Sequence, residues 1–116
     1  MQYALLIYTS EAEDMKRSPE DQEANMAAYY AFTEEVQKAG KMVAGEALHP
    51  TNTAKTVTVR NGKTSVVDGP FAETKEQFGG YYIVNADSIE EAAKWAAKIP
   101  GAKDGRVEVR PVWVFE

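Results

Sequence analysis

Two stretches of the sequence carry apolar side chains at consecutive positions, and they limit the possible folds most strongly. Tyr3–Tyr8 reads Tyr-Ala-Leu-Leu-Ile-Tyr, and Gly80–Ala86 reads Gly-Tyr-Tyr-Ile-Val-Asn-Ala. Short runs without a polar face are typical of strands that are covered on both faces of a sheet. Both stretches are therefore predicted to be central strands, and each face of their sheet needs a covering layer.

Two helices are predicted from their capping signals. The first begins at Ser18-Pro19-Glu20-Asp21, where serine caps the end, proline fits the first turn and the acids lie at the positive end of the helix dipole. It ends at Gly40. The second begins at Ser88 with Glu91 as a capping box and stops at Pro100-Gly101. The residues expected to face the core are Ala24, Ala27, Ala28, Ala31, Phe32, Val36 and Ala39 in the first helix, and Ile89, Ala92, Ala93 and Ala96 in the second.

The other elements are extended. A second strand is predicted over Met42–Leu48 and a last one over Arg106–Phe115, while Thr9–Arg17 is expected to be a surface loop. Lys55–Asp68 is predicted to be a β-hairpin, because alternating valines flank an Asn61-Gly62 pair, the preferred sequence of a type I′ turn.

This order of elements predicts one domain over residues 1–116, with an α+β, ferredoxin-like sheet, two helices on one face and an inserted hairpin. Two helices can cover only one face, although the central strands are apolar on both. An identical sheet is the simplest cover for the second face, so a homodimer with its sheets packed face to face is expected.

The composition excludes several classes of protein. The net charge is −5 and no basic stripe is present, so direct binding of nucleic acid is not expected. Without cysteine, disulfides, zinc–thiolate sites and thiol catalysis are excluded. The single histidine cannot form a multi-histidine metal site, and no metal or cofactor is expected. The N-terminus lacks a basic region followed by a long apolar stretch, so no membrane segment is predicted and a cytoplasmic location is the default.

The candidate site centres on Asp68–Tyr82. Asp68-Gly69-Pro70-Phe71 is either a well-made turn with Phe71 anchored in the core, or a turn that aims the Asp68 carboxylate into a cleft. Glu73, Lys75 and Glu76 follow as a charge run, which is more often a solvated face than a site. Gly79-Gly80 permits close approach of a ligand, of Phe71 or of a partner's backbone, and a packing role is favoured.

Two further residues are candidates. His49 is the only histidine and ends the second strand, where it is either an exposed strand-end residue or a general base within reach of Asp68 or Glu73. Arg110 shares one face of the last strand with Glu108, opposite Val107 and Val109. If that face looks into a dimer interior, Arg110 needs an acidic partner or an anionic ligand; an edge-strand salt bridge is the alternative.

Taken together, these residues resemble the YCII-related family, in the subgroup named for its Asp-Gly-Pro-Phe motif. The match spans nearly the whole chain and is most specific in Asp68–Tyr82. The resemblance implies a dimeric α+β barrel. In some members it implies partnership with an extracytoplasmic-function sigma factor, and in others an enzyme that uses a His–Asp pair. In shorter members that histidine lies in the first helix, where this chain has Asn25–Tyr30 without histidine, whereas Asp68 keeps its motif position.

The first functional expectation is a cytoplasmic homodimer that binds a small polar or anionic molecule in its barrel cleft. Catalysis would be isomerase-like or lyase-like proton transfer, by analogy with relatives of this barrel class. Asp68 and His49 are the candidate catalytic residues, and Phe71, Glu73, Lys75 and Arg110 are the candidate ligand-binding residues. The alternative is a non-enzymatic regulatory partner of a sigma factor, which would contact the acidic segment Glu11–Glu23.

Overall fold

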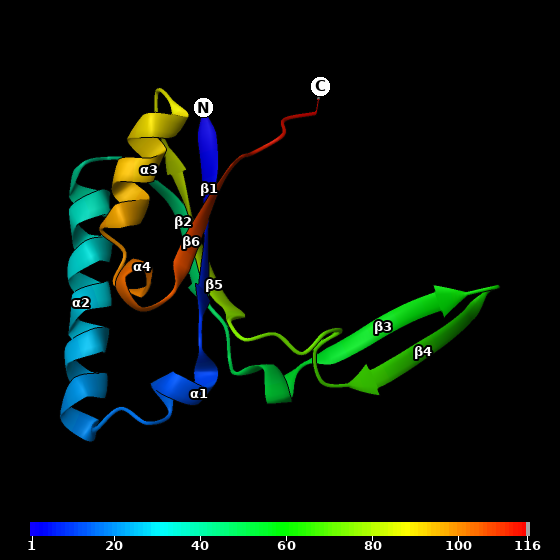
Figure 1. Ribbon diagram of the computed structural model, residues 1–116. Coiled ribbons are helices and arrows are strands. Elements are labelled where there is room, and N and C mark those ends of the chain that lie inside the picture. The colour runs from blue at the N-terminus through cyan, green and yellow to red at the C-terminus, as the bar shows by residue number, and fades with distance from the viewer. Residues whose placement is uncertain (116) are drawn as a thin grey trace.

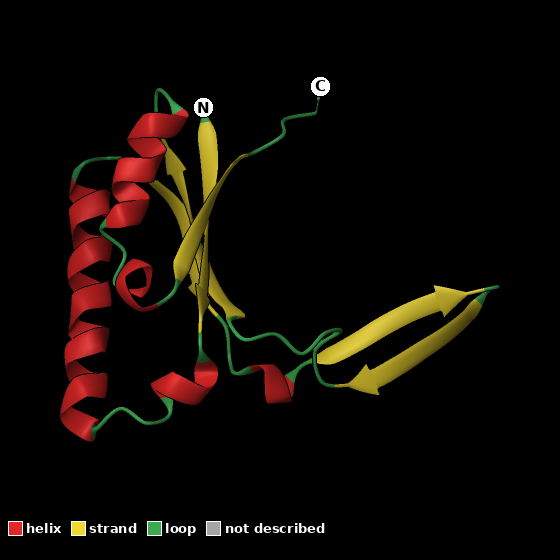
Figure 2. Ribbon diagram, in the orientation of Figure 1, coloured by secondary structure: helices red, strands yellow, loops and turns green. Residues whose placement is uncertain are grey.

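The structure, a computed structural model, describes residues 1–115 and consists of a helical layer packed on one face of an antiparallel sheet (Figure 1). The strand order is β2-β5-β1-β6, with β2 at Met42–Ala47, β5 at Gln77–Asn85, β1 at Gln2–Thr9 and β6 at Arg106–Pro111. The longer helices α2 (Pro19–Lys38) and α3 (Ile89–Ala97) lie side by side on the same face (Figure 2). The predicted ferredoxin-like α+β fold is confirmed.

Both helices begin where the sequence predicts. The Ser18 hydroxyl accepts a hydrogen bond from the Asp21 amide (3.1 Å), and the Ser88 hydroxyl accepts one from the Glu91 amide (3.1 Å). Each bond satisfies one of the amides that a helix N-terminus leaves without an intrahelical partner. Short helices α1 (Glu11–Asp14), η1 (Thr51–Thr53) and α4 (Gly101–Asp104) lie in the connections, so the predicted Thr9–Arg17 loop is partly helical.

The two faces of the sheet differ in their surroundings. Along β1, Tyr3, Leu5 and Ile7 are buried beneath the helices, and Leu5 lies between Tyr82 of β5 and Val109 of β6. The intervening side chains belong to the opposite face, which no helix covers in the described chain (Figure 1). The predicted two-faced central strand and one-sided helical cover are both present.

The buried stripe of α2 differs from the prediction. Phe32 and Val36 are buried as predicted, whereas the expected core positions Ala24, Ala27, Ala28, Ala31 and Ala39 are exposed. Large residues decide the orientation of the helix, because burying a phenylalanine or a valine removes more apolar surface from water than burying an alanine. The helix therefore turns Phe32, Val36 and the neighbouring Tyr29 toward the sheet. In α3, Ala92 and Ala96 are buried as predicted, but Ile89 and Ala93 are exposed.

The hairpin is separate from the main sheet. It consists of β3 (Lys55–Arg60) and β4 (Lys63–Asp68), which pair with each other through a turn with positive φ at Asn61 (51°) and Gly62 (75°). These torsions confirm the predicted type I′ turn. The hairpin projects beyond the open face of the sheet, and so does the segment after β6 (Figure 1). β6 ends at Pro111, earlier than predicted, and β5 begins at Gln77, earlier than predicted.

Candidate functional site

A groove of about 640 Å³ lies between α2 and the helix-facing side of β2 and β5. Its walls combine apolar and polar side chains, which is the usual character of a small-molecule site. Its lining includes Asn25, Met26, Tyr29, Thr33, Met42 and Tyr82.

The floor of the groove is made of residues with little or no side chain. Gly80 of β5 pairs with Ala47 of β2 on one side and with Ile7 of β1 on the other. Gly45 of β2 pairs with Tyr82 of β5. A Cβ at Gly80 would lie 2.9 Å from the Glu46 carbonyl oxygen, and one at Gly45 would lie 2.8 Å from the Tyr82 ring. Larger residues are therefore excluded at both glycines, and the lack of side-chain volume leaves the space open beneath α2.

Two tyrosines and one threonine form the polar wall. The Thr33 hydroxyl lies 2.9 Å from the Tyr29 carbonyl oxygen, four residues earlier in α2, and 2.9 Å from the Tyr82 hydroxyl of β5. The Tyr82 ring also packs edge-on against Phe32, with centroids 4.9 Å apart. Burial raises the pKa of Tyr29, although a hydrogen bond from the Gly101 backbone opposes the shift. Tyr29 is therefore a neutral phenol at physiological pH.

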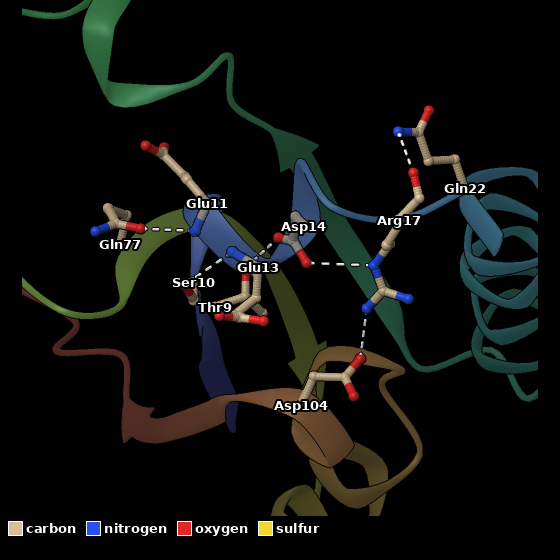
Figure 3. Close-up of polar contacts among 9 residues, drawn as sticks. All are labelled: Thr9, Ser10, Glu11, Glu13, Asp14, Arg17, Gln22, Gln77 and Asp104. Carbon is tan, nitrogen blue, oxygen red and sulfur yellow. Dashed lines mark hydrogen bonds and ion pairs between the residues drawn. The ribbon is translucent and has the colours of Figure 1, made fainter. Parts of the chain in front are cut away.

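An ionic cluster lies at the end of the groove near α1 (Figure 3). The Arg17 guanidinium contacts Asp104 (Nη2 to Oδ2, 2.6 Å) and Asp14 (Nε to Oδ1, 3.4 Å), and Thr9 donates to the other Asp14 oxygen (3.1 Å). The hydrogen bond to Asp104 contributes most to raising the pKa of Arg17. Two carboxylates surround one cation, so this end of the groove does not favour an anionic group.

The first turn of α1 fixes the connection between β2 and η1. The Glu11 amide donates to Gln77 Oε1 (2.8 Å), and the Glu11 carboxylate accepts bonds from the Thr51 amide (2.8 Å) and hydroxyl (2.7 Å). His49 is exposed in this connection. Its neighbour Leu48 donates a backbone bond to the Gly79 carbonyl (2.9 Å), which holds the segment against the start of β5.

The residues of the Asp-Gly-Pro-Phe motif lie at the base of the hairpin. Asp68 ends β4, its side chain is 86% exposed, and its partner in an ion pair is Lys55. Gly69 has a positive φ of 99°, and its backbone bonds to Ala54 and to the Thr56 hydroxyl hold the turn. Phe71 is 90% exposed, so the expected anchoring of this ring in the core is wrong for the protomer. The hydrogen bonds of the turn agree with the prediction of a structural turn at Asp68-Gly69-Pro70-Phe71.

The predicted site residues are not brought together in one protomer. Glu73 and Lys75 are exposed in the connection from β4 to β5. Arg110 is exposed on the open face of the sheet, in register with Ala4. The groove lining, over the part of the chain that the structure describes, contains neither these residues nor Asp68, His49 or Phe71. Their functional roles stay predictions.

Sequence reasoning missed Tyr29, Thr33 and Tyr82 as site residues. Tyrosine and threonine at these positions give no spacing signal, because their meeting depends on how α2 is rotated over the sheet. The available signal was the glycines. Gly79-Gly80 permits close approach of a ligand, of Phe71 or of a partner's backbone, and Gly45 is a second glycine within a predicted strand. Together they mark the floor of the groove.

Two negative findings apply to residues 1–115. No group of three or more His, Asp or Glu side chains is arranged to hold a metal ion there. No helix in that range has the length and apolar composition needed to cross a membrane.

The groove between helix and sheet, the ferredoxin-like plan and the inserted hairpin define a small α+β protein with a potential binding site. The chain belongs to the YCII-related domain family, whose model matches residues 1–116. It is 37% identical over 118 residues to the uncharacterised protein R00369 of Rhizobium meliloti (strain 1021), with 100% of this chain and 95% of the relative covered.

A solved structure with a similar fold is 5-chloro-2-hydroxyhydroquinone dehydrochlorinase (TftG) from Burkholderia phenoliruptrix AC1100, in complex with 2,5-dihydroxybenzoquinone. The TM-score is 0.56 at 17% identity, and the alignment covers 97% of this chain and 94% of the other. At this level of identity the likeness supports the fold.

Proposed function

We propose that the protein binds a small, neutral polar molecule in the groove between α2 and the sheet. The observation that carries this proposal is the composition of the groove: apolar walls, a floor of small residues, and hydroxyl groups of Tyr29, Thr33 and Tyr82 on one side. Such a combination of apolar area and few convergent polar groups is typical of ligand sites. The Arg17 cluster argues for a neutral ligand over the anionic one that the sequence left open.

Lyase-like or isomerase-like catalysis is an extension of this proposal. The dehydrochlorinase with the similar fold supports it by analogy alone. Within the groove, the Asp14 carboxylate is already paired with Arg17 and Thr9, and Tyr29 holds its proton. Glu46 is a further carboxylate residue of the lining. Asp68 and His49, which lie outside the groove, stay the candidates predicted from the sequence for a general base.

We further propose a homodimer in which the open sheet faces pack together. On this face Leu6 lies in register between Tyr81 and Glu108, and Ala4 lies between Ile83 and Arg110. Glu108 and Arg110 give the face charges of both signs, so a second copy related by a two-fold axis offers complementary partners. The hairpin and the segment after β6, with exposed Trp113 and Phe115, extend on this side (Figure 1).

A thermal-shift screen of small neutral metabolites tests the binding proposal. Ala47→Trp places a large ring on the groove floor and should abolish the ligand-induced rise in Tm. Ala93→Trp, on an exposed position of α3, is the matched control and should retain the rise. An equal response of both variants would reject the groove as the site. Asp68→Asn and Arg110→Ala, tested in parallel, report on the site predicted from the sequence.

The alternative function, a regulatory partner of a sigma factor, depended on the acidic segment Glu11–Glu23. Two of its acids serve the protomer itself, because Glu11 binds Thr51 and Asp14 binds Arg17. Glu13, Glu20, Asp21 and Glu23 are exposed, and charge reversal at these four positions in a pull-down with a candidate sigma factor is the direct test. The cytoplasmic location also stays a prediction, which cell fractionation would check.

A further inference from the structure

The positions of three oxygen atoms fix the direction of the hydrogen bonds on the polar wall of the groove. Thr33 Oγ1 lies 2.9 Å from the Tyr29 carbonyl oxygen and 2.9 Å from Tyr82 Oη. A carbonyl oxygen can only accept, and a threonine hydroxyl has a single hydrogen. If Thr33 donates to the carbonyl, Tyr82 must donate to Thr33, and both contacts contain a proton.

The opposite arrangement is unfavourable. If Tyr82 accepted a bond from Thr33, the Thr33 and Tyr29 oxygens would face each other at 2.9 Å without a proton between them. The bond from threonine to the carbonyl four residues earlier is also a common one in helices. The Tyr82 hydrogen is therefore committed to Thr33, and the lone pairs of Tyr82 Oη are what this residue offers a ligand.

Tyr29 is the second tyrosine of the polar wall. It holds its proton at physiological pH because burial raises its pKa. Its hydroxyl lies close to the Gly101 backbone, where a Cβ would be 2.7 Å from Tyr29 Oη. Tyr29 and Tyr82 both line the groove, so the acceptor at Tyr82 is accompanied there by a second, protonated phenol.

We infer that Tyr82, oriented by Thr33, selects ligands that carry a hydroxyl hydrogen, and that the ligand class is a small neutral molecule with a hydroxyl group on a planar ring. The inference rests on the proposed binding function of the groove and deepens it. The planar ring follows from the other walls, because methionine side chains and tyrosine rings contact flat apolar ligands favourably. Met26, Met42 and the rings of Tyr29, Tyr30 and Tyr82 supply such surfaces.

The test compares phenol with anisole by NMR titration of the whole protein, following the amides of Gly45 and Gly80 on the groove floor. Phenol can donate to Tyr82 and anisole cannot, so phenol should bind about fivefold more tightly, the effect of one net hydrogen bond. Anisole is the more apolar probe, so hydrophobic burial alone predicts the opposite order. The ratio of the two affinities therefore reports the hydrogen bond and not the general fit of the groove.

Three variants isolate the role of Thr33 as a positioning residue. Thr33→Val removes the acceptor for Tyr82, frees its hydrogen for anisole, and should abolish the preference. Tyr82→Phe should abolish it as well, whereas Thr33→Ser keeps the hydroxyl and should retain it. Equal binding of phenol and anisole to the native protein would overturn the inference and leave the groove as a site. Absence of any shift at Gly45 and Gly80 with either probe would reject binding of ring ligands in the groove, and the inference with it.

Discussion

At the scale of single residues, the groove depends on positions where a side chain is missing. Gly45 and Gly79 are both strand glycines close to the groove, but their surroundings differ. A Cβ at Gly45 would lie 2.8 Å from Tyr82 Cδ1 and 3.0 Å from Met42 Cε, while one at Gly79 would have no atom within 4 Å. Packing therefore requires glycine at position 45 but not at position 79.

Gly45→Ala should therefore lower the free energy of unfolding by about 1–3 kcal/mol, the usual cost of overpacking. The Tyr82 ring cannot move away freely, because it is held by Thr33 and by the edge-on contact with Phe32. Gly79→Ala is the matched control and should leave stability unchanged or slightly higher, since glycine is unfavourable in a strand. Urea unfolding of both variants checks the prediction, and equal midpoints would contradict it.

Glu91 predicts a pH dependence of stability. The hydrogen bond from the Asp87 amide (3.0 Å) is the main cause that lowers the pKa of this carboxyl from 4.5, and Lys41 (3.3 Å) adds to it. A lowered pKa in the folded state means that the stabilisation is fully present above pH 4.5 and is lost as the pH falls through the folded value.

Glu91→Gln keeps the shape of the side chain and removes its charge. Native protein should be more stable than this variant at neutral pH, and the difference should disappear in acid once the native carboxyl is protonated. Thermal unfolding over a pH series measures both curves. If the difference in stability between the native protein and Glu91→Gln stayed constant down to acidic pH, the charge of the Glu91 carboxylate would not contribute to the contacts with the Asp87 amide and Lys41.

At the scale of secondary-structure elements, the hairpin is stabilised locally. Its strands pair only with each other in the described chain, and Val57 and Val66, directly opposite in register, are both exposed. A lone two-stranded hairpin is marginally stable in water, so its turn matters more than it would inside a larger sheet.

Gly62→Ala should destabilise the hairpin by about 1 kcal/mol or more, because alanine is strained at a φ of 75°. Hydrogen exchange should show lost protection in β3 and β4 and unchanged protection in β1 and β5, since the hairpin does not pair with the main sheet. Lys63→Ala, next to the turn but at a strand position, is the control. Loss of protection in β1 would show that the hairpin and the sheet unfold together.

The elements themselves were predictable because their signals are local. Ser18, Ser88 and Asn61-Gly62 act through bonds to neighbours in the sequence, and the structure contains each of them. The groove was not predictable in the same way. It depends on the rotation of α2, which Phe32 and Val36 decide through contacts with distant strands. Their burial was predicted, but the alanines predicted beside them are exposed and Tyr29 packs against the core in their place.

At the scale of the whole molecule, the protomer is more extended than its length requires. Its radius of gyration is 16.2 Å. A compact domain of this length is expected to have a value of about 13 Å. The principal extents of 47 × 47 × 18 Å describe a flat body with projecting arms. The hairpin and the segment after β6 account for this shape, and both lie on the open side of the sheet (Figure 1).

Leu6→Asp should convert the proposed dimer into a monomer, because it places a charge at a position between Tyr81 and Glu108 on the open face. Burying an unpaired carboxylate against a second sheet is strongly unfavourable. Ala27→Asp, at an exposed position of α2 on the helical side, should leave the dimer intact. Sedimentation velocity at micromolar concentration distinguishes the species. A native protein that sediments as a protomer would reject the face-to-face dimer.

The attachment of the hairpin has a practical consequence for engineering. The chain enters it at Ala54 and leaves it at Gly69, and a single 2.7 Å backbone bond joins these two residues. The two ends of any segment inserted between them are therefore adjacent, and strand register elsewhere is independent of the length of that segment. Residues 55–68 form a natural exchange point, where an epitope or a fluorescent module can be grafted while the helix-covered sheet keeps its own geometry.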